Sequence, residues 1–218
     1  MHSEYSYDGR DPVDLIVAQA AAIGIDALAI TDHDDFRAAA ELLRIAPREG
    51  IIPIPGMEVT SAAGHVLALG IDEAIPTGLR FEATLDAIAD AGGISVIPHP
   101  FQRSRHGVAA KVDATAMAMA DAVEVYNSRL LTGRSNRRAA SFARSRDLPM
   151  TAGSDAHIAE MVGQAVTLVD APADDAESIL TAIAAGATTI EGSRTPWRIS
   201  VRQFAGGVRR RAHHLLSE

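Results

Sequence analysis

Histidines and carboxylates recur at the ends of apolar segments through the first 157 residues of the chain. Imidazole and carboxylate groups are ligands that Zn²⁺, Mn²⁺ and Fe²⁺ accept in proteins, and two ions bridged by a carboxylate support hydrolysis of phosphate esters. Nine side chains form this pattern: His2, Asp8, Asp32, His33, Glu58, His65, His99, Asp155 and His157. Their types and positions predict a metal centre built from nitrogen and oxygen ligands.

Some of these residues also have an ordinary structural explanation. A single histidine in an apolar strand, such as His65, is more often a core residue than a ligand. Asp8 and Asp32 stand in Asp-Gly and Thr-Asp pairs that are common in turns, and we expect Asp32 to orient His33. Glu58 follows the apolar run Ile-Pro-Ile-Pro-Gly-Met, where a buried carboxylate without a cation is costly. Its position therefore favours a ligand.

The elements that must position these side chains are short β-branched segments alternating with alanine-rich amphipathic ones. This alternation is typical of β/α units around a parallel sheet. We expect strands at residues 26–30, 51–59, 65–71, 94–97, 122–126, 149–153 and 165–169. Helices are expected at 12–24, 36–45, 81–91, 135–146, 173–185 and 199–216. The histidines then fall at the C-terminal strand ends, where barrel enzymes build their active sites.

The composition restricts the possible classes of protein. The 218 residues include 28 acidic and 20 basic side chains, a net charge of −8, and no cysteine. Disulfides, thiolate zinc sites and cysteine nucleophiles are thereby excluded, and a surface that coats nucleic acid is disfavoured. No segment has the pattern of a signal peptide or membrane span, so we expect a cytoplasmic protein without a membrane partner.

Several short motifs together carry a resemblance to a known family. They are His2-Ser3 with Tyr5-Ser6-Tyr7-Asp8-Gly9, Thr31-Asp32-His33, Gly56-Met57-Glu58, Gly64-His65, His99-Pro100 and Gly153-Ser154-Asp155-Ala156-His157. In this order they resemble the motifs of the PHP (polymerase and histidinol phosphatase) family. Residues 123–129 and 153–157 are particularly similar to short, stand-alone members. Each motif alone is weak, whereas the ordered set is specific.

The resemblance implies an α/β fold, a distorted (β/α)7 TIM-like barrel in a single domain, which would occupy residues 1–192. Residues 193–218 would form a connector and a basic amphipathic helix packed on the barrel, to which we assign no chemistry. The resemblance also implies two or three divalent Zn, Mn or Fe ions in three sites. The ligand sets would be His2, Glu58 and Asp155; Glu58, His65 and His99; and Asp8, His33 and His157.

The implied activity is that of a metal-dependent phosphoesterase, in which a hydroxide bridging two ions attacks phosphorus. Glu58, Asp155 and His157 would form the catalytic centre. The substrate-binding candidates are Arg103, Arg105, Asn127 and Arg129; any one arginine is equally well explained as a solvated loop residue. Few aromatic residues stand near strand ends, so we expect a small phosphorylated metabolite or nucleotide and no stable nucleic-acid partner. The oligomeric state stays open.

The first motif departs from the family pattern, in which two histidines flank one residue. Only the second, His2, is present, and Met1 stands in the intervening position. Either translation begins upstream, or the first metal site is altered and weakly occupied. The second possibility leaves an alternative function: a PHP module that binds metal or phosphate with little or no turnover. Metal-dependent amide hydrolysis on a similar barrel is a third interpretation, disfavoured by the arginine-rich loop.

Overall fold

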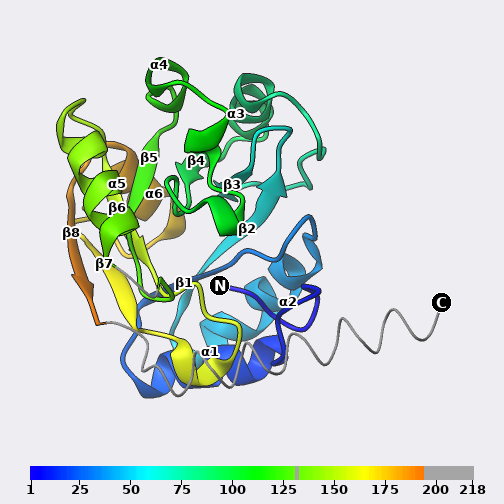
Figure 1. Ribbon diagram of the computed structural model, residues 1–218. Helices are drawn as coiled ribbons and strands as arrows, with labels where there is room; N and C mark the ends of the chain where they lie inside the picture. The colour runs from blue at the N-terminus through cyan, green and yellow to red at the C-terminus, as the bar shows by residue number, and fades with distance from the viewer. Residues whose placement is uncertain (131–132, 194–218) are drawn as a thin grey trace.

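The computed structural model describes residues 1–130 and 133–193, which form an α/β domain with a curled central sheet (Figure 1). Its strands are β1 Ala27–Ile30, β2 Ile52–Thr60, β3 His65–Leu69, β4 Ile94–Ile97, β5 Ala122–Asn127, β6 Met150–Gly153, β7 Ala165–Val169 and β8 Thr188–Gly192. Its helices are α1 Val13–Ala22, α2 Arg37–Ile45, α3 Phe81–Asp90, α4 Ala114–Met117, α5 Arg134–Arg144 and α6 Ala176–Ala184, with 3-10 turns η1 Ala46–Glu49, η2 Arg103–Arg105, η3 Val108–Ala110 and η4 Ala159–Met161. The expected helix at 199–216 lies outside the described residues.

The main sheet has the strand order β1-β2-β3-β4-β5-β6, with β3 antiparallel and the other five strands parallel to one another. The α/β class and the curled barrel-like sheet agree with expectation. The expected parallel arrangement was wrong for two strands, β3 and β7. β3 reverses because only residues 61–64 link it to β2, too few for a parallel crossover. β7 leaves the main sheet and pairs with β8, a strand whose Thr-Thr-Ile-Glu-Gly sequence lacks an apolar face.

One face of the sheet carries a small apolar cluster. It consists of Ile54, Val96, Ala122, Ile179, Leu180 and Ile183, from β2, β4, β5 and α6. Because side chains alternate along a strand, Glu58 shares its face of β2 with Ile54, and Glu124 shares its face of β5 with Ala122. The alternation of side chains thus puts the apolar cluster and the carboxylates of Glu58 and Glu124 on the same face of the sheet.

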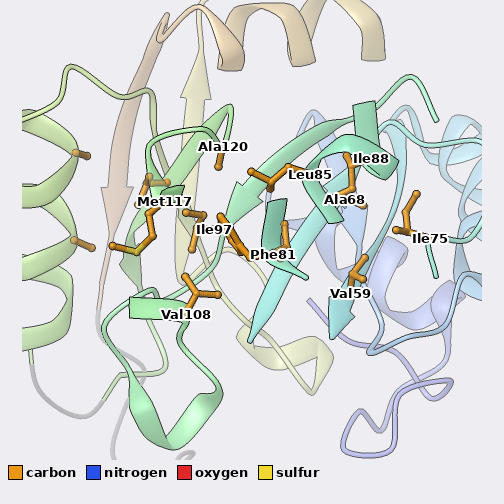
Figure 2. Close-up of a cluster of buried hydrophobic side chains, with 14 of the residues drawn as sticks. Val59, Ala68, Ile75, Phe81, Leu85, Ile88, Ile97, Val108, Met117 and Ala120 are labelled. Carbon is orange, nitrogen blue, oxygen red and sulfur yellow. The ribbon is translucent and has the colours of Figure 1, made fainter. Parts of the chain in front are cut away.

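The opposite face of β2, β3, β4 and β5 builds a larger core against α3 and α5. Figure 2 shows part of this cluster, which includes Val59, Ala68, Phe81, Leu85, Ile88, Ile97 and Val108. α1 and α2 cover β1 in a separate cluster, with Ile16, Ile30 and Leu42 at its centre. Both faces of the sheet are therefore fixed by packing.

The first two residues lie between β1 and the segment after β6. The Met1 carbonyl accepts a hydrogen bond from the Thr31 amide at 2.8 Å, and the His2 amide donates to the Ala156 carbonyl at 2.8 Å. These bonds place His2 at the C-terminal strand ends. Within the described ranges, no helix combines the length and the apolar character needed to cross a bilayer.

Two adjacent leucines of α2 give a direct test of this packing. Leu42 is fully buried and Leu43 is 50% exposed. We predict that Leu42→Ala lowers the free energy of unfolding by about 2–5 kcal/mol, because it leaves a cavity in the α1–α2–β1 cluster. Leu43→Ala should change it by no more than about 0.5 kcal/mol. Urea unfolding followed by circular dichroism measures both; equal effects would contradict the assigned helix face.

Candidate metal centre

Glu58 lies near the end of β2, buried among four imidazoles. Its Oε2 is 3.1 Å from His2 Nε2 and 3.8 Å from His33 Nδ1, and its Oε1 is 2.6 Å from His65 Nδ1 and 3.6 Å from His99 Nε2. The side chain of Glu58 is 4% exposed. A single carboxylate therefore presents each oxygen to a different pair of ring nitrogens.

Several polar atoms of this cluster have no hydrogen-bond partner, although they are buried. Among the described residues, they are His33 Nδ1, His65 Nδ1, His99 Nδ1 and Glu58 Oε1. The 2.6 Å approach of His65 Nδ1 to Glu58 Oε1 lacks the angles of a hydrogen bond. Buried polar groups are nearly always paired, and unpaired ones cost free energy. These imidazole nitrogens and this carboxylate oxygen lie close together without hydrogen bonds, and they are atom types that bind a cation.

A second group of donors lies beside the first. His157 Nε2 is 2.8 Å from Asp8 Oδ2, and His33 Nε2 is 3.8 Å from Asp8 Oδ1. His2, Asp8, His33 and His157 each offer a ligand atom within 4.8 Å of the others, and so do His33, Glu58 and His65. Donors about 2.1 Å from one ion lie roughly 3 to 3.5 Å apart, so small inward shifts of these side chains would let either group surround an ion.

Asp155 joins the two groups at the end of β6. Its Oδ1 is 3.5 Å from His2 Nε2 and 3.5 Å from His157 Nδ1. The structure thus brings together the eight residues expected as ligands, although the carboxylate of Asp155 also contacts two arginines. Their assignment to three ions stays a prediction.

The charge states of these groups follow from their mutual contacts. Burial opposes charge on His2, but Asp155 and Glu58 outweigh it and raise the pKa of His2 to about 9. Burial lowers the pKa values of His33 and His157 to about 4. The pKa values of Glu58 and Asp155 lie well below their usual range, since nearby imidazoles and arginines overcome the effect of burial. Ionised carboxylates and neutral imidazoles bind metals, so Glu58, Asp155, His33 and His157 already have that form, whereas His2 would release a proton on binding an ion.

Strained backbone positions two of the candidate ligands. His99 and Asp155 have φ values of 33° and 47°, in the left-handed region that residues with a Cβ rarely adopt. Glu124 supports the first of them, because its Oε2 accepts a hydrogen bond from the His99 amide at 2.8 Å. Burial raises the pKa of Glu124 to about 7. Asn127 bridges Glu124 Oε2 and Asp155 Oδ2 through its side-chain amide, at 3.1 and 3.3 Å.

The expectation for Asp32 was wrong. Its carboxylate does not orient His33; it accepts hydrogen bonds from the Ser3 amide and hydroxyl, both at 2.6 Å. Asp32 therefore anchors the loop that follows His2. In the same loop, Gly9 passes so close that a Cβ would lie 1.8 Å from the Ser3 carbonyl oxygen, which explains the glycine there.

The expected arginines divide into two groups. Arg105 Nη1 is 2.8 Å from Asp155 Oδ2, while Arg129 Nη1 lies 2.6 Å from His157 Nε2 and 3.5 Å from Asp155 Oδ1. Arg103 is exposed on η2 and, within the described part of the chain, forms no ion pair with a centre residue. The structure thus brings Arg105, Arg129 and Asn127 to the centre and leaves Arg103 at its periphery.

Two rings at the edge of the centre were missed or left unassigned by sequence analysis. Tyr7 is 64% exposed and stacks on His33, with ring centroids 4.9 Å apart. His106, in the left-handed region at φ 56°, places its ring 4.9 Å from that of His65. The Tyr-Ser-Tyr-Asp motif was a usable signal for Tyr7, since it immediately precedes a candidate ligand.

The PHP domain pattern matches residues 1–126, and a PHP-associated pattern matches residues 133–188. The chain belongs to the PHP domain family. As a PHP protein it is similar in fold to a crystal structure from Bacteroides vulgatus, described as a two-domain protein containing a predicted PHP-like metal-dependent phosphoesterase. The TM-score is 0.75 at 21% identity, over 88% of this chain and 63% of that one.

Two sequence relatives are less extensive matches. An uncharacterized protein from Methanocaldococcus jannaschii is 30% identical over 113 residues, which is 52% of this chain and 64% of the relative. A phosphoribosyl 1,2-cyclic phosphate 1,2-diphosphodiesterase from Eggerthella lenta is 32% identical over 82 residues, 35% of this chain and 31% of that one. The PHP chain thus spans less than two thirds of the length of either relative.

Metal content tests the role of Glu58. We predict that Glu58→Gln lowers the bound transition metal more than any other single substitution, because both carboxylate oxygens face candidate ligands. Elemental analysis of purified protein measures the loss. Glu49→Gln, at an exposed position of η1, is the control for the same change of charge. Wild-type metal content in a folded Glu58→Gln protein would contradict this assignment.

Proposed function

We propose that this PHP protein hydrolyses phosphate esters with the help of two or three divalent Zn, Mn or Fe ions, and that its substrate is a small phosphorylated metabolite or a nucleotide. The observation that carries the proposal is the buried Glu58 carboxylate between two pairs of imidazoles, with donor atoms that lack hydrogen bonds. The carboxylate oxygens and imidazole nitrogens of this site are ligand types that hard and borderline divalent ions prefer. The ligands would be those predicted from sequence, with Glu58 shared between two ions.

Ions bound there would supply an activated water and neutralise charge on the transferring phosphoryl group. The chain's own groups have complementary tasks. Glu58, Asp155 and His157 hold the reacting centre in place, since their side chains are at most 10% exposed, Asp155 contacts His157, and His2 lies between Glu58 and Asp155. Low exposure also excludes bulk water, which strengthens each electrostatic contact with substrate.

Arg105, Arg129 and Asn127 would bind the phosphate that reacts. Both guanidinium groups already lie against Asp155, so they are within reach of a phosphate bound at the centre. Guanidinium groups bind phosphate oxygens through two parallel hydrogen bonds. Burial lowers the pKa of Arg129, with Asp155 acting in the opposite direction. It remains cationic at neutral pH because an arginine pKa begins far above neutrality.

Support for a small substrate comes from the overall acidity of the chain and from the E. lenta relative, which is named as a diphosphodiesterase of a phosphoribosyl cyclic phosphate. The alternative function is a PHP module that binds ions or phosphate with little turnover. One observation favours it: Arg129 Nη1 stands within 2.9 Å of both ring nitrogens of His157, where a cation would otherwise compensate Asp8 and Asp155.

A substrate panel distinguishes the two functions. The full chain, with its metal content measured, is assayed with Mn²⁺ and Zn²⁺ against phosphate monoesters, cyclic and linear diesters, short DNA strands and amides. Turnover of a small phosphate ester that Glu58→Gln abolishes would support the proposed enzyme. Stoichiometric metal binding without turnover of any compound would instead support the binding module.

For the phosphate contact, we predict that Arg105→Ala lowers kcat/KM by about tenfold, mainly through KM, because one charge-assisted bond to substrate is lost. Arg144→Ala is the control, since Arg144 is exposed in the last turn of α5. Steady-state kinetics on the best substrate of the panel gives both values. Unchanged kinetics for Arg105→Ala would assign the phosphate to another group.

A further inference from the structure

The helix α1 has almost no polar face, although it lies at the lower edge of the molecule (Figure 1). Of its ten residues, only Asp14 and Gln19 are polar. A helix on the surface of a globular protein normally carries polar residues opposite its apolar stripe, and a helix that is apolar on all sides is normally covered. The composition of α1 therefore indicates that something packs on its outward side.

Two apolar stripes run along α1. One is buried against β1 and α2 and consists of Val13, Ile16, Val17 and Ala20. The other is exposed, is called here the outer stripe, and consists of Leu15, Ala18, Ala22 and Ile23, the residue that follows the helix. Leu15 and Ile23 are 49% and 45% exposed. Single exposed apolar residues are common, whereas a continuous stripe is typical of a surface that binds another element.

The sequence of residues 199–216 has the apolar periodicity of a helix that needs a partner. Its apolar residues recur at i, i+3, i+4, i+7, i+11 and i+14, and they are Val201, Phe204, Ala205, Val208, Ala212 and Leu215. This spacing corresponds to one face of an α-helix. Gly206 and Gly207 disfavour such a helix in isolation, because glycine has a low helix propensity and short helices are marginal in water. Contact with a second apolar surface would offset this cost.

The described part of the chain ends close to the outer stripe. Ser193, which follows β8, donates a backbone hydrogen bond to the Gln164 carbonyl at 2.7 Å and one from its hydroxyl to Gln164 Oε1 at 3.1 Å. The neighbouring Gly163 packs closely on Ile23, since a Cβ on this glycine would lie 2.5 Å from Ile23 Cδ1. The chain therefore leaves the described region near the C-terminal end of α1.

The lengths of the segments fit a contact with α1. Residues 194–198 span at most about 17 Å when extended, which is enough for the chain to turn back onto α1. The ten residues of α1 are about 15 Å long, and a helix over residues 199–216 would be about 27 Å long. Such a helix could run antiparallel to α1 along the whole outer stripe.

Charge favours the same contact. Residues 194–218 contain six arginines and one acidic residue, whereas residues 1–193 carry a net charge of −13. The helix α1 and the turn after it contain no lysine or arginine, and Asp14 and Asp26 are exposed near the two ends of the outer stripe. An arginine-rich segment is attracted to an acidic surface that lies within about 10 Å of it.

We propose that residues 199–216 bind as an amphipathic helix to the outer stripe of α1 in the same chain, with Phe204 and Val208 on the side that faces α1. The arginines of the segment then lie toward solvent and the acidic ends of the stripe. Two other occupants have suitable chemistry. A second copy of the chain would cover the stripe by self-association, and an anionic membrane would take up the basic segment instead.

The test is hydrogen–deuterium exchange of the full chain, read by mass spectrometry of peptides from residues 199–216. Wild type is compared with Leu15→Lys and Ala18→Lys, which put a charge on the outer stripe at exposed positions. Circular dichroism checks that both variants are folded. The matched control is Met119→Lys, because Met119 is 59% exposed and follows α4, which lies at the opposite edge of the molecule from α1 (Figure 1).

We expect the amides of residues 203–216 in wild type and control to exchange about tenfold or more slower than in an unstructured peptide. Both lysine variants should lose this protection, because burying an unpaired ammonium group is costly. Phe204→Lys should have the same effect without altering α1. Exchange at the unstructured rate in wild type, or protection that persists in the folded lysine variants, would overturn the docking.

The other two occupants give different results. Light scattering measures the mass of the protein under each condition of exchange. Protection that appears only at concentrations where two chains associate would identify a second copy as the occupant. Protection that appears only with vesicles containing phosphatidylserine, and not with phosphatidylcholine vesicles, would identify a membrane contact. Either result would overturn docking within one chain.

Discussion

The burial of Glu58 among four imidazoles is the constraint on which the rest of the structure depends. An ionised carboxylate at 4% exposure is stable only if positive charge or hydrogen-bond donors surround it. The surrounding groups come from the N-terminal segment, β3 and the turns after β1 and β4, so four separate parts of the chain must arrive at one point. The curled sheet meets this requirement, because its strand ends converge.

Much of this arrangement was predictable, since it depends on local patterns. Apolar alternation located β4 at Ile94–Ile97 and β7 at Ala165–Val169 with correct bounds. The histidines and carboxylates stood at strand ends, and their convergence follows from the α/β class. β8 was not predictable, because its pairing with β7 joins residues 19 to 27 positions apart, from Val169 with Thr188 to Ala165 with Gly192, and does not depend on an apolar pattern of its own.

Side-chain partners within the centre were harder to predict, since they depend on distances of a few ångströms. Asp32 stands next to His33 in sequence, yet its carboxylate turns to Ser3. Arg103 and Arg105 are equivalent by sequence, but the 3-10 turn between them points only Arg105 toward Asp155. The left-handed backbone of His99 likewise has no signature in residue type, because histidine is not a residue that turns require.

The way in which residues 1 and 2 join the sheet has a further consequence. One backbone hydrogen bond links them to the residue after β1 and one links them to the segment after β6, whereas β2 and β3 share a five-residue ladder. This junction of residues 1 and 2 with the two neighbouring segments is called here the seam. Because it has few backbone hydrogen bonds, it opens by local unfolding more readily than the β2–β3 ladder. His2 lies on this seam, between Glu58 of β2 and Asp155 beyond β6. A cation bound by these three side chains would hold the seam closed. Slower amide hydrogen exchange along the seam would therefore report that the centre is occupied.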